Sequence, residues 1–445
     1  MKYSIVTFGC RVNQADSLRL EEDLRARGGV ESASREADLV IVNTCSVTAT
    51  ADQGARQAIR RIARENPRAR IVATGCYATR CEDEVAALPG VVCVVRNSEK
   101  LTWLSVGQGF SPDSGPCGKP IEPGVAGRTA FTIRAQTGCE ERCSYCIIPS
   151  TRGASRSVPI AELVREVNRV AAAGFKEVIV TGVHLGSFGR DLSPSASLLD
   201  LLRALEAIDA DVTFRISSLE PMDCTPAIVA FVASSARFMP HFHLPLQHAS
   251  DRILAAMRRP YTVDYYRRLV DGIVERLPHA SIGTDMIVGF PAETDEDFAA
   301  NLAYLPSSPL THIHVFPYSD RPGTEASRMA GKVHGSVIRD RGAQLRAIGA
   351  ALTARFRDAQ AGTLRPGLTL EDGTLVVTDN YLKVRIPPGL RRNERVSVRL
   401  EPEAAALCEA FVKGERLAPD AQQTIVASGS SRPEGQEIGS SAASR

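Results

Sequence analysis

The sequence lacks the features of a membrane protein, a disulfide framework and a strongly basic nucleic-acid binder. No apolar run is long enough to span a bilayer, and the opening MKYSIVTFGC enters a strand-like segment without a secretory leader pattern, so we expect a cytoplasmic protein. The formal net charge is only +2, so any contact with nucleic acid must rest on local positive charge. The cysteine count, 11, is odd, which argues against paired disulfides and favours metal binding or catalysis.

The length and composition indicate a globular chain of several domains. With 445 residues it is too long for one ordinary domain, and its 44% hydrophobic residues are enough to bury a core. Residues 1–127 alternate strand-like and helix-like segments, which predicts an open parallel α/β sheet. The expected strands are 3–8, 37–44, 70–75 and 91–95, with helices over 15–29 and 51–66.

A second alternating region covers residues 128–362. Its six strand candidates, separated by helical stretches, predict a full or partial (β/α) barrel with working residues at the C-terminal strand ends. Residues 363–418 predict a small antiparallel β module, and the Ser/Gly/Glu/Pro-rich residues 419–445 predict a disordered tail. The six strand candidates are 131–136, 176–182, 212–218, 241–247, 281–290 and 311–319.

Three cysteines lie in one predicted loop, QTGCEERCSYCIIPSTRG: Cys139, Cys143 and Cys146. Three thiolates this close can hold three irons of a cubic iron–sulfur cluster, which commonly takes four cysteines. Without a fourth cysteine nearby, one iron stays open for substrate chemistry, as at catalytic zinc sites. A structural zinc site would need a fourth ligand, and the first histidine downstream, His184, is far away in sequence.

Three other cysteines share a sequence context: Cys10 in TFGC, Cys45 in VNTC and Cys76 in ATGC. Each follows a predicted parallel strand, and neighbouring strand ends of an open sheet converge on one crevice. We therefore predict a second three-cysteine site; the alternative is three unrelated buried cysteines, which are common in cores. The remaining cysteines show no such pattern and are interpreted as structural or incidental: Cys81, Cys93, Cys117, Cys224 and Cys408.

The three-cysteine loop resembles the signature of the radical S-adenosylmethionine (SAM) superfamily, with Tyr145 as the aromatic residue before the last cysteine. Two cysteine sets in this order resemble the methylthiotransferase family, over nearly the whole chain before the tail. Within it, GCRVNQADS and FPYSDRPGTEASRM resemble the MtaB-like branch. The resemblance implies an N-terminal α/β domain over 1–127, a partial radical-SAM barrel over 128–362, and a short form of the RNA-binding TRAM module over 363–418.

The resemblance also implies two [4Fe-4S] clusters and SAM as cofactors. The first cluster would bind and split SAM, giving a radical that abstracts hydrogen from C2 of an adenine, and the second would supply sulfur; a second SAM supplies the methyl group. Acid–base catalysis cannot reach that C–H bond because it has no useful acidity. The first cluster would be held by Cys139, Cys143 and Cys146, and the auxiliary cluster by Cys10, Cys45 and Cys76.

The implied substrate of the MtaB-like branch is N6-threonylcarbamoyladenosine beside the tRNA anticodon. Other branches of the family modify N6-isopentenyladenosine in tRNA or an aspartate of a ribosomal protein, and both remain alternatives. The expected partners are the tRNA anticodon loop and an electron donor that the sequence does not identify. We expect a monomer that has no membrane partner.

Polar residues and glycines at the barrel strand ends are the candidates for SAM contacts. A glycine there lets backbone approach a ligand closely, and polar side chains can hold ribose and methionine groups. Taken singly, each is equally explained by turn chemistry or helix capping, as Asp223 and Ser250 are by capping. The candidates are Gly182, Ser217, Glu220, Gln247, Asp285 and Gly289.

Histidines and basic stretches allow further hypotheses. Alternate spacing places His241 and His243 on one strand face, but we interpret them and His248 as packed or hydrogen-bonded rather than as metal ligands. Two basic stretches are candidates for phosphate contacts, with a solvated surface as the alternative. They are Arg56, Arg60, Arg61 and Arg64 on one helix, and Arg391, Arg392 and Arg395 in the third region.

Two other classes of protein compete with the methylthiotransferase interpretation. A non-enzymatic iron–sulfur or zinc protein that binds RNA would not need an open-site loop combined with six βα units. A cobalamin-dependent radical-SAM enzyme would be expected to offer a histidine to cobalt from its N-terminal domain, yet no histidine precedes His184.

Overall fold

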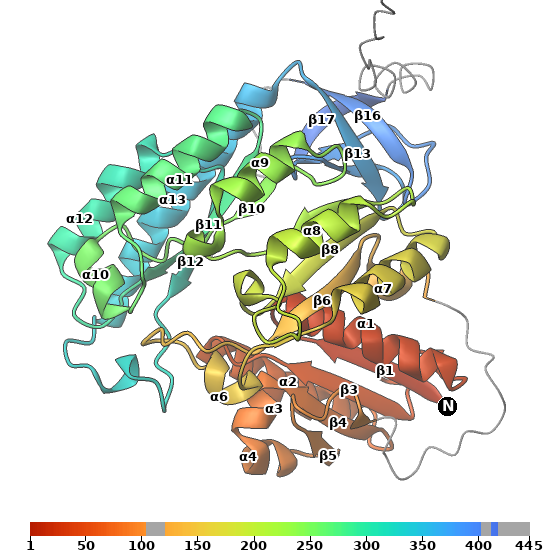
Figure 1. Ribbon diagram of the computed structural model, residues 1–445. Coiled ribbons are helices and arrows are strands. Elements are labelled where there is room, and N and C mark those ends of the chain that lie inside the picture. Colours follow the sequence, from red (N-terminus) through yellow and green to blue (C-terminus); the bar gives the residue numbers. More distant parts are fainter. Residues whose placement is uncertain (104–120, 402–410, 417–445) are drawn as a thin grey trace, which may run out of the picture. The chain divides into compact units, whose positions relative to one another are not determined.

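The computed structural model (Figure 1) describes residues 1–103, 121–401 and 411–416, the last of these for the backbone only. It divides into two units: Met1–Gln360 with Asp379–Tyr381, and Ala361–Thr378 with the chain from Leu382 onward. The boundary expected near residue 127 thus falls inside the first unit. In the described part, no helix combines the length and apolarity needed to cross a membrane.

The N-terminal part of the first unit is a five-stranded parallel sheet in the order β2-β1-β3-β4-β5. Alternate residues of β3 face opposite helices: Leu39 and Ile41 pack in a cluster with Leu20 and Leu24 of α1, whereas Val40 and Val42 pack with α2. Burial on both faces explains the unbroken apolar run of this strand. The bounds are β1 Lys2–Thr7, α1 Arg11–Ala26, β2 Val30–Glu31, β3 Leu39–Thr44, α2 Ala49–Glu65, β4 Arg70–Gly75, α3 Cys76–Arg80, α4 Glu82–Ala86 and β5 Val91–Val95.

Two details of this sheet differ from the expectation. Strand β2 was not predicted, because its two residues are exposed and pair only with β1, which leaves no hydrophobic pattern. Helix α1 begins four residues earlier than expected, since Cys10 takes the N-cap position and its carbonyl accepts from Gln14 N at 3.1 Å. The earlier start places Arg11 on the helix directly beside a predicted cluster ligand.

The rest of the first unit is a partial barrel, which confirms the predicted fold class. Strands β6, β8 and β9 form one parallel series and β10, β11 and β12 another, and single bridges such as Ser218 to His243 continue from β9 to β10. In the described residues no pairing joins β6 to β12, so the barrel is open. The strands are β6 Phe131–Thr137, β7 Arg156–Ser157, β8 Glu177–Gly182, β9 Thr213–Ile216, β10 His241–His243, β11 Ser281–Val288 and β12 His312–Pro317.

Helices follow the barrel strands and bury one face of each. On β11, Ile282, Met286 and Val288 belong to the main apolar core, whereas Gly283 and Asp285 alternate with them on the inner face. The inner face is therefore free to carry polar side chains. The helices are α6 Ile148–Arg152, α7 Ile160–Ala172, α8 Leu198–Glu206, α9 Pro226–Ser234, α10 Asp251–Ala256, α11 Val263–Arg276, α12 Asp295–Tyr304 and α13 Gly335–Gln360.

The second unit is a small closed barrel in the order β13-β14-β15-β17-β16. All its neighbouring strands pair antiparallel except β15 with β17. The predicted small β module is thus present as a closed barrel, while the predicted tail over 419–445 lies outside the described residues. The strands are β13 Leu364–Leu370, β14 Leu375–Thr378, β15 Lys383–Arg385, β16 Arg395–Leu400 and β17 Phe411–Arg416.

Candidate active site

The first set of cysteines lies in the loop between β6 and α6. The loop is held by backbone hydrogen bonds from Cys139 N to Gly153 O at 3.0 Å and from Ser144 N to Met257 O at 3.1 Å. Burial, together with the nearby Cys143 and Cys139 thiols, raises the pKa of Cys146 to about 12. The three thiols thus lie within electrostatic reach of one another and need a positive partner to ionise.

Two basic side chains supply that positive charge. Nη1 of Arg259 lies 3.1 Å from Sγ of Cys143, and the same guanidinium pairs with Glu220. Nε2 of His184 lies 2.7 Å from Asp223, and the ring also hydrogen-bonds Cys139. Burial lowers the pKa of His184, but these two hydrogen bonds outweigh burial and raise it to about 9. Nε2 of His184 is engaged by Asp223, so the imidazole is positioned as a hydrogen-bonding partner of the cysteine loop.

These contacts could not be predicted because the residues that make them are far apart in the sequence. His184 follows β8 and Arg259 follows α10, and neither was predicted to reach the cysteine loop. The suggestion that Asp223 caps a helix was wrong: Thr225 caps α9, accepting from Ile228 N, whereas Asp223 holds His184. Ser250 takes the N-cap position of α10 but makes no capping hydrogen bond; its hydroxyl donates to Asp297.

The second set of cysteines meets at the adjacent ends of β1, β3 and β4. Cys10, Cys45 and Cys76 follow these three strands, which lie side by side and in register at their ends. Glycine makes the approach possible: Gly9 has a φ of 89°, and a Cβ built on it would lie 2.5 Å from Sγ of Cys45. The convergence at one sheet edge agrees with the strand-end argument from sequence.

A buried charge network lies beside this second set. Oδ2 of Asp16 accepts from Nζ of Lys100 at 3.0 Å and from Nη2 of Arg152 at 3.3 Å, and all three side chains are at most 2% exposed. Arg152 also hydrogen-bonds Cys76. Burial favours the neutral thiol of Cys76, but Arg152 and Lys100 outweigh it and lower the pKa of Cys76. No basic side chain of the described residues acts on Cys45 in this way, and its burial raises its pKa to about 11.

The short helix α6 connects the two sets of cysteines. It begins two residues after Cys146 and packs against α3, whose first residue is Cys76. Nδ2 of Asn97 donates to Thr151 O at 3.0 Å and lies 3.6 Å from Sγ of Cys76. The N-terminal sheet and the segment that follows the barrel loop are therefore in contact next to Cys76.

The chemistry of both donor sets fits iron–sulfur ligation. Each set consists of three thiols with N–H donors directed at sulfur, the arrangement that stabilises cluster-bound thiolates. Among the described residues, Cys81, Cys93 and Cys224 contribute to neither set; Cys224 is fully buried and Cys93 Sγ donates to Val94 O. Cys117 and Cys408 lie outside the described residues.

The six residues predicted to contact SAM differ in their placement. Gly182 ends β8, Ser217 follows β9 and Gly289 follows β11, as expected for strand-end positions. Gln247 has a φ of 72°, a strained conformation for a residue with a side chain, and is fixed by backbone hydrogen bonds to Asp285 O and Ile287 N.

The other two SAM candidates have partners within the protein. Glu220 pairs with Arg259. Asp285 lies in the middle of β11 rather than at its end, and contacts two histidines.

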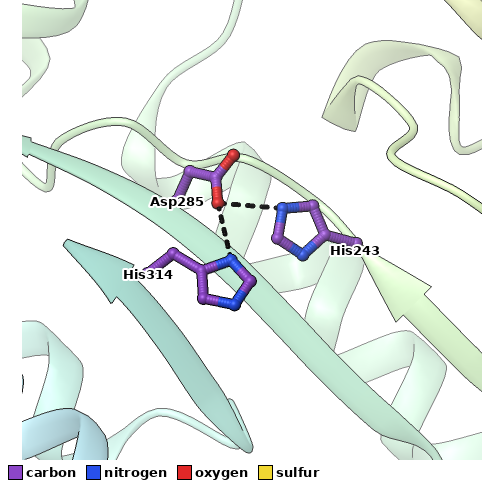
Figure 2. A group of neighbouring side chains, drawn as sticks. All are labelled: His243, Asp285 and His314. Carbon is purple, nitrogen blue, oxygen red and sulfur yellow. Dashed lines mark hydrogen bonds and ion pairs between the residues drawn. The ribbon is translucent and has the colours of Figure 1, made fainter. Parts of the chain in front are cut away.

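Those histidines form an inner-face group that the sequence analysis missed. Figure 2 shows Nε2 of His243 and Nδ1 of His314 directed at the same oxygen of Asp285, at 3.0 and 3.2 Å. Burial disfavours the charged form of Asp285, but the two histidines outweigh it and hold its pKa well below the usual range. The three ligand atoms lie within 4.8 Å of one another, close enough to share a metal ion. The repeat of HFH at 241–243 as HIH at 312–314 was the available signal.

The other histidines and the basic stretches have ordinary partners. His248 accepts from Ser250 N at 3.0 Å, and His241 lies against the ring of Tyr381, with centroids 4.3 Å apart. Arg56 donates to Tyr77 and pairs with Glu84. The remaining arginines of α2, Arg60, Arg61 and Arg64, line an open surface groove next to Phe8. In the second basic stretch, Arg391 forms an ion pair with Glu394 on the surface.

Two stretches of the chain match known protein families. Residues 2–96 match the model described as "Uncharacterized protein family UPF0004", and residues 133–305 match the radical SAM superfamily. The chain is 35% identical to threonylcarbamoyladenosine tRNA methylthiotransferase MtaB of Aquifex aeolicus, over 86% of this chain and 96% of that protein. It is 35% identical to the protein of the same name from Thermotoga maritima, over 92% and 98%. A tRNA-2-methylthio-N(6)-dimethylallyladenosine synthase of Acidothermus cellulolyticus is 32% identical over 83% and 77%.

A solved structure shares the fold. The radical SAM methyltransferase TsrM of Kitasatospora setae aligns with a TM-score of 0.52 at 18% identity, covering 73% of this chain and 77% of that chain. The fold and the superfamily match define a radical-SAM enzyme, which implies one [4Fe-4S] cluster and SAM as cofactors. More particularly, the chain belongs to the radical-SAM methylthiotransferase family, in its MtaB-like branch.

Proposed function

We propose that this protein adds a methylthio group to C2 of N6-threonylcarbamoyladenosine beside the anticodon of tRNA. The observation that carries the proposal is the pair of three-cysteine sets joined through α6, since this transfer needs a source of both a radical and sulfur. Relatives named for this reaction, from Aquifex aeolicus and Bacillus subtilis, are 35% and 32% identical to the chain. Relatives named for dimethylallyladenosine are also similar, so the substituent on the base is the point to test.

In this proposal each set of cysteines has its own role. When bound, the first cluster supplies the electron that cleaves SAM and the second supplies sulfur, chemistry that an unactivated C–H bond requires. Around them, Arg259 and His184 place N–H groups against thiols of the first set, while Arg152 and Lys100 lower the pKa of Cys76. The ligands would be Cys139, Cys143 and Cys146 for the first cluster, and Cys10, Cys45 and Cys76 for the second.

The barrel strand ends next to the first set are the proposed SAM site. Ser217 donates to Thr181 Oγ1 at 3.0 Å, and Glu220 is anchored by the arginine that contacts Cys143, so both are already oriented. The proposed contacts are Gly182, Ser217, Glu220, Gln247, Asp285 and Gly289.

The proposed RNA partner is the anticodon loop, because bases of a single-stranded loop can turn outward and enter a buried site. The groove on α2 with its three arginines is the proposed phosphate contact in the first unit. The closed β barrel of the second unit is a further proposed RNA contact. The electron donor remains to be identified, and we propose that the enzyme works as a monomer.

Mass spectrometry of tRNA nucleosides from cells with and without this gene tests the proposal. We expect the methylthio form of threonylcarbamoyladenosine to disappear and its parent to accumulate, and expression of the gene in trans to reverse both changes. Loss of methylthio-isopentenyladenosine instead would show that the substrate is isopentenyladenosine in tRNA. Unchanged tRNA together with a lost methylthio-aspartate in ribosomal protein would refute a tRNA substrate altogether.

A further inference from the structure

A continuous polar group lines the inner face of the barrel between β10 and β12. The imidazoles of His241 and His312 are stacked with ring centroids 6.4 Å apart, and the ring centroids of His312 and His314 are 5.4 Å apart. Burial lowers the pKa of His312 to about 3, so it is neutral, and His243 and His314 both contact the same oxygen of Asp285 (Figure 2). That carboxylate is therefore engaged by histidines, and in the described residues it forms no ion pair with a further cation.

Arg11 adds such a cation. It follows Cys10 at the start of α1, and its Nη2 donates to Oη of Tyr381 at 2.7 Å, with the guanidinium carbon 5.8 Å from the ring centroid. The same ring lies against His241, which connects Arg11 to the polar group. Arg11 is half-buried, yet the described residues place no carboxylate within ion-pair distance of it.

A second arginine, Arg128, lies close to Arg11. Arg128 is also half-buried, and its Nη1 donates to the neutral amide oxygen of Gln14 at 3.0 Å. In the described part of the chain it too has no carboxylate partner, and it lies near enough to Arg11 for the two guanidinium groups to repel each other. Two partly desolvated guanidinium groups without a counter-ion are unfavourable unless an anion binds between them. Guanidinium groups also match the planar geometry of a carboxylate.

The proposed substrate carries such an anion. The threonylcarbamoyl substituent ends in a carboxylate, whereas an isopentenyl substituent has neither charge nor hydrogen-bonding groups. In adenine N1 is flanked by C2 and by C6, the carbon that carries N6, so a substituent on N6 lies on the same side of the base as the reacting carbon. Arg11 is adjacent to Cys10, one of the thiols proposed to hold the sulfur-supplying cluster. A base presented there would bring its N6 substituent near Arg11.

We infer that Arg11, assisted by Arg128, binds the carboxylate on the N6 substituent of the substrate base and thereby selects an anionic over an apolar substituent. This inference rests on the proposed function and deepens it by naming the residues that determine specificity. A hydrogen bond to a charged group increases affinity by a factor on the order of 10 to 100. We therefore expect a preference of this size for a charged over a neutral N6 substituent.

The test uses the full-length protein and two anticodon stem-loop RNAs, one carrying threonylcarbamoyladenosine and the other its neutral methyl ester. We expect the wild type to bind the acid on the order of 10- to 100-fold more tightly than the ester by fluorescence anisotropy. Arg11→Met should reduce this ratio to about threefold or less, and Arg11→Lys should retain part of it because it keeps the charge but not the fork geometry. Arg19→Met, an exposed change on the same helix, is the matched control and should leave the ratio unchanged.

Each outcome decides one question. An equal affinity of the wild type for acid and ester, or an unchanged ratio in Arg11→Met, overturns the inference. If Arg11→Met does not fold, Arg128→Met replaces it, and an unchanged ratio there has the same meaning. A wild type that prefers the acid yet forms no methylthio product on the threonylcarbamoyl RNA refutes the proposed function and keeps the anion site. A wild type that methylthiolates acid and ester equally well refutes the anion site and keeps the proposed function.

Discussion

Replacing Asp16 by asparagine should destabilise the N-terminal part of the enzyme strongly. The carboxylate of Asp16 is 1% exposed and pairs with Lys100 and Arg152, themselves 1% and 2% exposed. Asparagine is nearly isosteric, so the change removes charge rather than volume and leaves two buried cations unpaired. Breaking a buried ion pair in this way costs about 3–5 kcal/mol, a large share of the stability of a typical domain.

The pH dependence of this effect follows from the direction of the pKa shift. Burial disfavours the charged form of Asp16, but Lys100, Arg134 and Arg152 outweigh it and hold its pKa below the ordinary value. A depressed carboxylate pKa contributes stability above the unfolded-state pKa of about 3.9 and loses it as the pH falls towards the folded value. The difference between wild type and Asp16→Asn should therefore be constant from about pH 5 to 7 and shrink only in acid below about pH 4.

Urea unfolding followed by hydrogen exchange of β1, β3 and β4 is the assay, because local exchange separates the sheet from the rest of a large chain. The double variant Asp16→Asn with Lys100→Met is the matched control, since it removes one unpaired cation and should recover part of the loss. An Asp16→Asn protein whose sheet exchanges as slowly as that of the wild type would refute the reasoning. So would a double variant that is less stable than the single one.

Three further results are expected. Cys45→Ala should retain SAM cleavage under reducing conditions but form no methylthio product, whereas Cys139→Ala should lose both; product formation by Cys45→Ala, measured by mass spectrometry, would contradict the proposed roles. Gly9→Ala should lose roughly half of the bound iron, as expected if one of two four-iron clusters is lost, because the added Cβ would overlap Cys45. Gly28→Ala is the control, since Gly28 also has a positive φ but nothing lies within 4 Å of the added Cβ. It should lose only about 1 kcal/mol of stability and keep its iron. Arg259→Met should lower iron retention in the loop set on dilution into chelator, and an iron half-life equal to that of the wild type would exclude a role for its contact with Cys143.

Much of the fold could be predicted from short-range pattern. Strand β3 is an unbroken apolar run because helices cover both of its faces, and this run is visible without knowing the partners. The six parallel barrel strands were each recognisable for a similar reason, since one face of every strand packs against helices. The two-residue strands β2 and β7 carried no such signal.

The cysteine positions could also be predicted, because thiols at the ends of neighbouring parallel strands must converge. Cys10, Cys45 and Cys76 needed only the strand assignment, and the loop cysteines needed only their spacing. Arg11 is written beside Cys10 in the sequence, yet nothing there indicates that it lacks a counter-ion.

Sequence pattern alone thus predicts most strands, the parallel α/β character of each half and the two sets of thiols, because these follow from residues that are neighbours or that repeat with a fixed period. Which charges meet depends on the three-dimensional fold. Asp16 and Arg152 are 136 positions apart, and Asp285 meets His243 and His314 from two other strands. An ion pair depends on where two side chains end in space, so the pattern around Asp16 or Arg152 does not indicate their contact, and the repeated HFH and HIH do not indicate that Asp285 joins the histidines.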